Sequence, residues 1–549
     1  MIYRYYLFLL LIIYPALSFS QSKTHFDSNF SAIMEFPPPE ANLDRDFLLP
    51  YQQPLNDKNC TTFTTTNYGA DYNKSIPKSD SLSYRDYIFR NNGDMFHFNS
   101  FKGNIYPLFG GEIGNDSYAS KKVFDYFGGL HTDGIIGNKF SYSANYIGGY
   151  LNGPSYLDSI IKTTRVIPGL GYAYPHGTTV TGYSYQYWDG YISYYPNNIF
   201  NFQLGQGKQF WGDGYRSLLL SDASNSYPYF KITTNIWHIQ YTNLYTIMQD
   251  VEPTGTGTNF PLKYIAAHFL SWNISKRLNC SLFEVVIWHG NEGDSSYRSF
   301  DPSYLNPIIF YRPIEFSLGS PDNELVGATF KLKVARNGQF YGQVLIDDFT
   351  LHNTLSHDGF WASKQGLQFG FKEFNLFHAK NISFQTEIDY VRPYTYSEST
   401  PNDNYSNYGQ PLADPMGANF IESASFLTWF YKNLIIQGSL DVYRVGLDPS
   451  TGKLDPNTGQ YFDYGQNIFR SYDLVDFQSN IYGNYAGQGV STYLGTAGLR
   501  FAYIISPKMH LKAELGINDR YEKEGTTTTN SPYIYFGVKT SLGNLYSDF

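Results

Sequence analysis

Residues 499–505 read LRFAYII, residues 511–517 read LKAELGI and residues 534–542 read IYFGVKTSL. Within each stretch apolar residues alternate with polar or small ones, and a short turn containing Pro507 separates the first two. Because successive side chains of a strand point to opposite faces, each stretch predicts a strand with one oily and one polar face. In a soluble sandwich the polar face contacts water, whereas in an outer-membrane barrel the oily face contacts lipid and the polar face lines the lumen.

The aromatic content helps to decide between these two folds. The chain has 52 Tyr, 43 Phe and 7 Trp among its 549 residues, so that 19% of it is aromatic. Aromatic girdles at the two membrane interfaces require many amphipathic rings. The composition therefore favours an outer-membrane barrel, and a Tyr-rich soluble β-protein is the alternative.

Hydropathy and charge exclude other classes. Hydrophobic residues make up 42% of the chain, and the mean hydropathy is −0.36. After the N-terminus no run of about 20 apolar residues could form a spanning helix, so strands must make any membrane crossing. The net charge of −9 and the pI near 5.7 give no basic footprint for nucleic acid, and we expect no nucleic-acid partner.

The N-terminus predicts export. Arg4 precedes an apolar stretch over residues 5–16, and small residues follow it, which is typical of a secretory signal peptide over residues 1–20. Residues 21–92 show no sustained periodicity and predict an extension outside the barrel or a plug within it, while residues 93–549 predict the barrel. The two cysteines, Cys60 and Cys280, are too few for a disulfide framework or a metal cluster, and their spacing does not show whether they pair.

The connections between strands alternate in length. Short turns are predicted at residues 137–138, 196–198, 275–277, 337–338, 379–381 and 432–433, and Asn337-Gly338 is the strongest hairpin signal among them. Long connections are predicted at about residues 207–228, 290–322, 349–363, 393–418, 446–494 and 519–531. In outer-membrane barrels the short turns are periplasmic and the long loops face outward. We predict an all-β fold, a transmembrane antiparallel β-barrel of about 18 strands, with 16 as the alternative.

The polar phase of the strands predicts which charged side chains face the lumen. This set is Lys331, Lys333, Glu387, Asp389, Asp441, Arg500, Lys512 and Glu514. Glu387 and Asp389 share a face and are candidates for the acid and base of a glycosidase, but a polar lumen lining is the favoured interpretation. No zinc-protease helix, serine-hydrolase elbow or phosphate loop is present, so we expect no enzyme, no metal and no cofactor.

One segment, residues 204–222, has a composition that suits saccharide recognition. It combines glycines with a Trp, a Tyr and charged side chains directly after a predicted strand. An aromatic ring can stack on the apolar face of a sugar, and charged groups can bind hydroxyls or acidic substituents. The predicted glycan-binding residues are Lys208, Trp211, Asp213, Tyr215 and Arg216. The alternative is a conformationally demanding loop that folds into the barrel mouth.

This segment, together with residues 306–313 (NPIIFYRP) and the hairpins around them, resembles the Wzi-type capsule-assembly outer-membrane proteins, and especially their RemB-like relatives among gliding-motility surface proteins. The resemblance implies an 18-stranded barrel with a plugged lumen that attaches exported polysaccharide to the cell surface as a lectin. In the gliding relatives the implied role is in motility. Residues 21–92 depart from the family, because they lack the amphipathic pattern expected of its periplasmic helices. The terminal Phe549 resembles the signal for the barrel-assembly machinery.

These observations predict a non-enzymatic protein of the outer membrane, at the surface of a Gram-negative cell. Its predicted partners are capsular or surface polysaccharide, outer-membrane lipid and, during biogenesis, the barrel-assembly machinery. The alternative functions are a pore for small solutes or oligosaccharides, indicated by the mixed-charge lumen, and a hydrolase embedded in the barrel.

Overall fold

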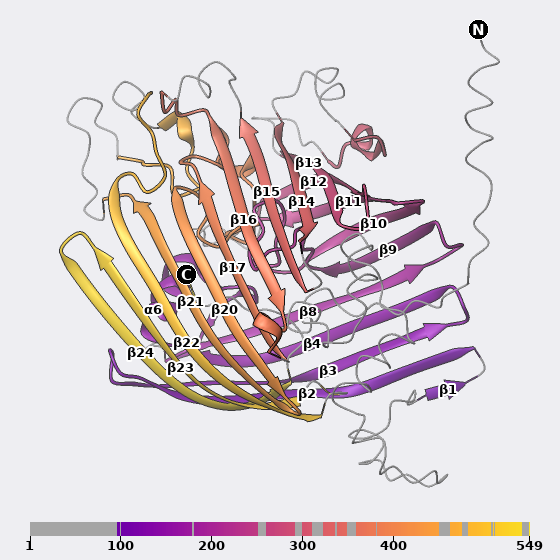
Figure 1. Ribbon diagram of the computed structural model, residues 1–549, viewed down its shortest axis with the longest axis horizontal. Helices are drawn as coiled ribbons and strands as arrows, with labels where there is room; N and C mark the ends of the chain where they lie inside the picture. Colours follow the sequence, from indigo (N-terminus) through magenta and orange to yellow (C-terminus); the bar gives the residue numbers. More distant parts are fainter. Residues whose placement is uncertain are drawn as a thin grey trace.

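The fold is a closed antiparallel barrel, seen in a computed structural model (Figure 1). The structure describes residues 96–98, 100–177, 181–250, 260–290, 299–309, 322–334, 337–348, 358–379, 381–449, 462–474, 481–506, 509, 511–540 and 548. The predicted signal peptide, the extension over residues 21–92, Cys60 and Phe549 lie outside the described residues. Cys280 lies in the barrel wall and is a free thiol.

Eighteen strands form the barrel wall, each hydrogen-bonded to the next along the chain, and the last pairs with the first to close the ring. They are β2 (Phe101–Asp116), β3 (Lys121–Ile136), β4 (Phe140–Asn152), β8 (Tyr183–Tyr194), β9 (Phe200–Gly207), β10 (Tyr227–Ile236), β11 (Ile239–Gln249), β12 (Leu262–Asn273), β13 (Leu278–His289), β14 (Asn323–Lys333), β15 (Gly338–Asp348), β16 (Lys364–Phe374), β17 (Ile382–Val391), β20 (Phe420–Tyr431), β21 (Leu434–Leu447), β22 (Val490–Ser506), β23 (Leu511–Glu524) and β24 (Thr527–Thr540). The predicted fold class and the strand count of 18 are confirmed.

The remaining elements are short. Two strands add to the barrel sheet, β1 (Phe96–Phe98) beside β2 and β7 (Tyr174–Pro175) beside β8. Two small hairpins pair β5 (Val166–Ile167) with β6 (Gly171–Tyr172) and β18 (Ser406–Asn407) with β19 (Gln410–Pro411). The described helices are α6 (Ser155–Thr164), η2 (Pro302–Leu305), η3 (Leu376–His378), η4 (Pro401–Asp403) and η5 (Tyr472–Leu474). Within the described ranges, no helix has both the length and the hydropathy needed to cross a bilayer.

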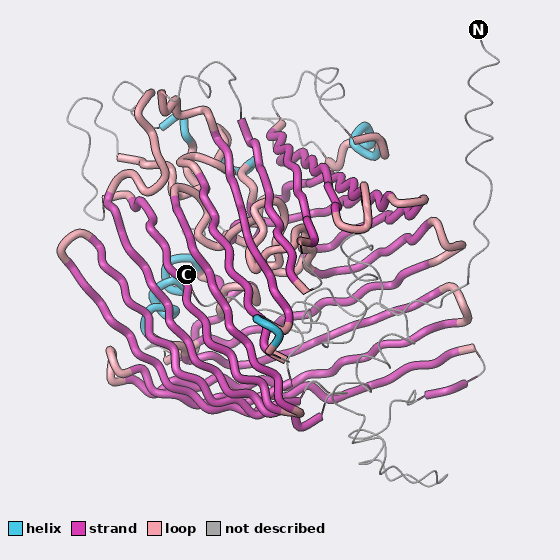
Figure 2. Tube along the Cα trace, in the orientation of Figure 1, coloured by secondary structure: helices cyan, strands magenta, loops and turns pink. Residues whose placement is uncertain are grey.

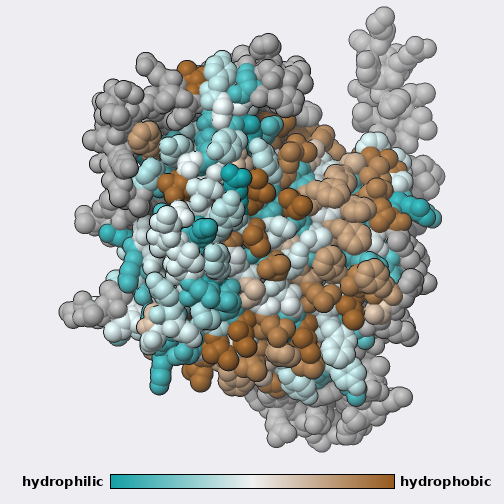
Figure 3. Space-filling model, turned by 60° about the vertical axis from the view of Figure 1, so that its left-hand side comes forward, coloured by the Kyte–Doolittle hydropathy of each residue, from teal (hydrophilic) through white to brown (hydrophobic). Residues whose placement is uncertain are grey.

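The outward face of the wall is oily, as the alternation predicts. Large apolar side chains point away from the lumen along successive strands, for example Ile388 of β17, Leu440 of β21, Phe501 of β22, Leu515 of β23 and Phe536 of β24, and all are exposed. Figure 3 shows hydrophobic side chains gathered over the lower and right-hand part of one face, with hydrophilic ones toward its upper left. Lipid is the solvent that such a surface requires.

The two ends of the barrel differ as expected. At one end tight turns join β3 to β4, β12 to β13 and β20 to β21, and the other end carries most of the long connections. One predicted long connection, residues 519–531, is wrong: β23 and β24 stay paired up to Glu524 and Thr527, so only a tight turn joins them. The reason is that residues 519–524, which are charged except for Tyr521, pair with the Thr-rich residues 527–532, and a polar ladder of this kind suits a hairpin that projects beyond the bilayer.

A long connection that the sequence did not reveal, residues 153–182, contains helix α6. The helix lies within the ring of strands (Figure 1). Its start is fixed by Asp116 of β2, whose Oδ2 accepts hydrogen bonds from the Ser155 backbone N–H at 2.8 Å and from its hydroxyl at 2.6 Å. Its buried Ile161 packs with Tyr183 and Tyr185 of β8. The helix therefore fills part of the lumen against β2 and β8.

Candidate functional site in the barrel lumen

The segment between β9 and β10, residues 208–226, folds back into the barrel, and we call it the plug segment. Figure 2 shows loop segments that occupy the space inside the ring of strands. A backbone hydrogen bond of 2.8 Å from Trp211 N to Leu220 O turns the plug segment into a narrow hairpin. Its tip extends across the lumen. Lys331 of β14 binds Asp213 at 2.6 Å, and Glu387 of β17, on the far side of the ring from β9, binds the backbone of Arg216.

Apolar packing holds the base of the plug segment. Trp211 is 1% exposed, and its ring stacks on Phe269 of β12 at 5.2 Å between centroids and meets Phe283 of β13 edge-on at 5.8 Å. Residues 218–220, three consecutive leucines, are fully buried in the same cluster. Since burial of one such side chain contributes about 1.5–3 kcal/mol, this core strongly favours the inserted conformation.

Polar side chains of the wall bind the backbone of the plug tip. The Glu387 carboxylate accepts hydrogen bonds from the backbone N–H groups of Tyr215 at 2.7 Å and Arg216 at 2.8 Å. Gln343 Oε1 accepts one from Leu218 N at 2.8 Å. These contacts satisfy the backbone donors of a loop that is buried away from water, where unpaired donors are costly.

A second long connection, residues 392–419 between β17 and β20, covers the plug segment from the outer end. Two tyrosines of this connection donate hydrogen bonds to plug carbonyls: Tyr396 to Leu218 O at 2.8 Å and Tyr405 to Leu219 O at 2.7 Å. All of these side chains belong to the same buried apolar cluster. The two connections and the wall of β12 to β21 thus form one packed core inside the barrel.

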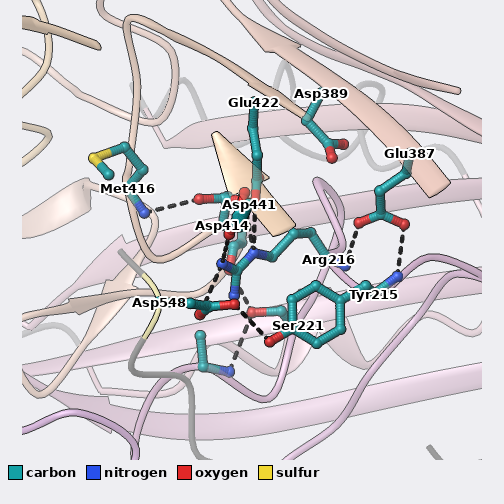
Figure 4. Close-up of polar contacts among 12 residues, drawn as sticks. Tyr215, Arg216, Ser221, Glu387, Asp389, Asp414, Met416, Glu422, Asp441 and Asp548 are labelled. Carbon is teal, nitrogen blue, oxygen red and sulfur yellow. Dashed lines mark hydrogen bonds and ion pairs between the residues drawn. The ribbon is translucent and has the colours of Figure 1, made fainter. Parts of the chain in front are cut away.

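Arg216 is the electrostatic centre of this core (Figure 4). Its side chain is 1% exposed, and its guanidinium donates to the Tyr443 hydroxyl at 2.9 Å. It also pairs with carboxylates of two wall strands, of the 392–419 connection and of the penultimate residue of the chain: Glu422 at 3.0 Å, Asp441 at 3.1 Å, Asp414 at 3.7 Å and Asp548 at 3.0 Å. One side chain therefore ties the plug segment to three other parts of the chain.

The charges around Arg216 are uneven, because several carboxylates share one cation. Burial alone would lower the pKa of the Arg216 guanidinium, but Asp548, Tyr443 and Glu422 raise it well above its ordinary value. Burial, together with the nearby charge of Glu422, raises the pKa of Asp414 well above its usual range.

The structure places the five predicted glycan-binding residues inside the lumen, not at an outer mouth. Trp211 and Arg216 are buried as described, and Asp213 binds Lys331. Lys208 is buried and donates to Asp222 O at 3.0 Å, and the Tyr215 hydroxyl donates to Asp548 at 2.8 Å. Their side chains have protein partners because the segment folds inward. This agrees with the alternative interpretation of the segment, a conformationally demanding loop that folds into the barrel.

The charged residues predicted to face the lumen all lie on inward positions of the wall, and they fall into two groups. Lys331, Glu387, Asp389 and Asp441 surround the plug segment, and Lys333 lies half-buried at the end of β14. The other group forms a network on β2 and β22 to β24, in which Glu514 binds Lys512 at 2.7 Å, Lys539 at 3.3 Å and Arg500 at 3.5 Å, and Glu112 binds Lys539 at 2.8 Å.

Glu387 and Asp389 do not form an accessible acid and base pair. Glu387 is buried and holds the plug backbone and the Tyr341 hydroxyl, the latter at 2.7 Å. Asp389 is buried and accepts from Gln368 Nε2 at 2.8 Å. Over the described ranges, no group of three His, Cys, Asp or Glu side chains is arranged to hold a metal ion.

Sequence reasoning missed that part of the lumen wall is apolar. On β11 to β13 the usual order of the two faces is reversed, with apolar side chains inward and polar ones outward. There the inward face carries Phe269 and Phe283, while the outward face carries a fully buried contact of 3.2 Å between His268 Nδ1 and the Glu284 carboxylate. Residues 299–309 pack against the outside of this wall: Tyr245 donates to Leu305 O at 3.2 Å. The signal was present, because His268 and Glu284 stand at positions whose alternation would otherwise face lipid.

Comparison with known proteins supports this architecture. The structure matches Wzi of Escherichia coli, described as an outer-membrane protein involved in group 1 capsule assembly and a carbohydrate-binding β-barrel, with a TM-score of 0.51, 13% identity and coverage of 94% of both chains. The chain has the fold of Wzi. At this identity the likeness shows the fold alone. At that level it confirms the predicted resemblance to Wzi-type barrels, whereas the closer resemblance to RemB-like proteins stays a prediction.

Other outer-membrane barrels match less well. OccK1 of Pseudomonas aeruginosa matches with a TM-score of 0.42 and 6% identity, covering 80% of this chain and 98% of its own. A score below 0.5 carries no functional argument. No protein-family model and no curated protein matches the sequence. The Wzi-type fold thus places the chain among outer-membrane barrels.

Proposed function

We propose that this outer-membrane barrel binds exported polysaccharide at the cell surface and performs no catalysis. The observation that carries the proposal is the filled lumen: the plug segment crosses the barrel and is fixed by Arg216 and Glu387. Packing of this kind suits a rigid scaffold for the outer connections rather than a path for solutes. The Wzi-type fold adds support, because Wzi itself is described as carbohydrate-binding.

In this proposal the residues of the plug segment act on glycan binding indirectly. Arg216 and Trp211 hold the 392–419 connection in place through Asp414 and the shared apolar core. That connection lies at the end with the long loops, which faces outward in barrels of this class. Direct contact of Lys208, Trp211, Asp213, Tyr215 or Arg216 with a glycan would require the plug segment to leave the lumen.

A pore is the second candidate, and one observation favours it. In the network on β2 and β22 to β24, the side chains of Arg500 and Lys539 keep 29% and 27% of their surface exposed. This side of the lumen is therefore less tightly filled among the described residues than the side occupied by the plug segment. Mixed charges with accessible surface are typical of a conducting lumen.

Two measurements on the purified protein test the proposal. Beads that carry surface or capsular polysaccharide should retain the wild-type barrel, and planar bilayers that contain it should show little open-channel current. Failure of retention by every polysaccharide would refute the binding function, and a large steady conductance would favour the pore. The finer assignments, to capsule assembly or to gliding motility as in RemB-like proteins, are tested by loss of cell-bound polysaccharide or of gliding after deletion of the gene.

A further inference from the structure

At the outer end of the barrel two long connections join to form a small platform. Residues 358–363, before β16, run beside residues 481–485, before β22. Backbone hydrogen bonds link them from Trp361 N to Ile481 O at 3.0 Å, from Gly483 N to Asp358 O at 2.8 Å and from Asn484 N to Gly359 O at 2.9 Å. The platform is therefore built by pairing of the two connections, which holds the backbone that carries its side chains.

Aromatic rings cover this platform, and we call them the ledge: Phe360, Trp361, Tyr472, Tyr482 and Tyr485. Phe360 lies 5.7 Å from Tyr482 and 6.1 Å from Trp361, and Trp361 lies 5.0 Å from Tyr472, between ring centroids. The inner rings are half-buried, whereas Tyr482 and Tyr485 are 58% and 54% exposed. The ledge thus offers exposed ring surface next to rings that are fixed by packing.

Polar groups adjoin the ledge. Arg392 donates from Nη2 to Phe360 O at 3.1 Å, and its Nε is buried without a hydrogen-bond partner among the described residues. Glu398 accepts a hydrogen bond from the Tyr472 hydroxyl. A ring face beside a hydrogen-bond donor and a carboxylate acceptor is the combination that binds a sugar, whose C–H groups are apolar and whose hydroxyls both donate and accept.

Among the described residues the charge balance near the ledge is acidic, even with Arg392 counted. Arg470 is neutralised by Asp448 at 2.9 Å and Asp463 at 3.6 Å, and Lys364 by Asp347 at 3.3 Å. Glu398 and the exposed Asp473 add further carboxylates. A densely anionic polymer would be repelled by this surplus, whereas a neutral polymer would not.

We infer that the ledge is the glycan-binding site and that its ligand is a neutral, hydroxyl-rich polysaccharide. This inference rests on the proposed polysaccharide-binding function and names its site and ligand class. Exposed Tyr482 and Tyr485 stack on sugar rings, the terminal N–H groups of Arg392 donate to ring or hydroxyl oxygens, and Glu398 accepts from hydroxyls. An aromatic girdle in lipid would need no such donor and acceptor beside it.

The test compares retention of the full-length, detergent-solubilised protein on beads of cross-linked dextran and on beads carrying alginate, in low and high salt. The variants are Tyr482→Ala with Tyr485→Ala, and Arg392→Gln. The matched control is Tyr431→Ala, because Tyr431 is 51% exposed but lies beside the short turn at the opposite end of the barrel. Heat-modifiable gel mobility shows that each variant is folded.

We expect wild type and the Tyr431 control to bind dextran equally, the double tyrosine variant to bind roughly 10-fold or more weakly, and Arg392→Gln to bind more weakly than wild type. Alginate should bind less well than dextran in low salt. Equal dextran binding by wild type and both ledge variants would overturn the assignment of the site and leave the proposed function intact. Stronger binding of alginate in low salt would overturn the ligand class, and retention on neither polymer would refute the inference.

Discussion

Replacement of Arg216 by methionine removes the cation that holds the plug segment and keeps most of the apolar stem. The guanidinium makes three hydrogen bonds, to Glu422 at 3.0 Å, to Asp441 at 3.1 Å and to Tyr443 at 2.9 Å, besides its ion pair with Asp548. Without it, the buried carboxylates of Glu422 and Asp441 have no counter-charge from the plug segment. We therefore expect the inserted conformation to lose stability relative to an open one.

The size of the effect follows from the burial of these groups. Removal of one partner from a buried ion pair costs about 3–5 kcal/mol, because the other charge is left uncompensated. Every 1.4 kcal/mol changes an equilibrium constant tenfold, so the population with an open lumen should rise by roughly 10²-fold to 10³-fold or more. An opening that is too rare to detect in wild type should then become measurable.

Planar-bilayer recording measures this directly. Arg216→Met should show frequent channel openings, and Arg216→Lys, which keeps the charge but loses the planar fork, should lie between it and wild type. The control is Arg277→Met, in an exposed turn at the opposite end. If Arg216→Met inserts normally and remains as closed as the control, Arg216 does not anchor the plug segment.

Three further predictions test other parts of the account. Gly359→Ala should lower the local stability of the platform by about 1–2 kcal/mol, because Gly359 has a φ of +72° and a Cβ there would lie 2.7 Å from Asn484 N. Faster proteolysis within residues 481–489 would show this loss. The control Gly438→Ala should leave proteolysis unchanged, because its Cβ would meet nothing within 4 Å. Ile388→Lys should lower the free energy of unfolding in liposomes by about 2–4 kcal/mol, because Ile388 is 55% exposed on the lipid face of β17; an effect no larger than that of Ile388→Leu would contradict the assignment of that face. Burial and the nearby Asp448 raise the pKa of Asp463 to about 6. The folded protein therefore binds this proton more tightly than the unfolded chain does. The local stability that protonated Asp463 contributes is complete below about pH 4 and falls by roughly 3 kcal/mol as the pH rises through 6. Hydrogen exchange at Gly465, corrected for intrinsic rates, should show this loss in wild type and not in Asp463→Asn, and exchange that is independent of pH would refute it.

The barrel wall could be predicted from the sequence because its rule is local. Alternation places Arg500, Lys512 and Glu514 on one face and Phe501 and Leu515 on the other, and the structure follows it. The strand count follows from the same alternation and from turns such as 432–433. Alternation does not show where a paired ladder continues beyond the membrane. The prediction of a long connection at residues 519–531 was wrong for this reason.

The interior could not be predicted, because its contacts join residues that are far apart in the chain. Arg216 finds Glu422, Asp441 and Asp548 across more than 200 positions, and no spacing in a single sequence encodes those pairs. The composition of the plug segment was informative but ambiguous, since Trp, Tyr, Arg and Gly serve a buried loop as well as a sugar site. The ledge was missed because its rings come from two connections that carry no common motif.

The central claim is that residues 208–226 lie inside the barrel, and cross-linking in intact membranes tests it most directly. In a background without Cys60 and Cys280, Asp213→Cys with Lys331→Cys should be joined by a short bis-maleimide, because these side chains meet at 2.6 Å. Asp213→Cys with Leu332→Cys should not be joined, because the exposed Leu332 is adjacent in sequence but points to the lipid. Efficient joining of the first pair alone is the predicted result. Absence of that product, or equal joining of both pairs, would show that the plug segment does not occupy the lumen.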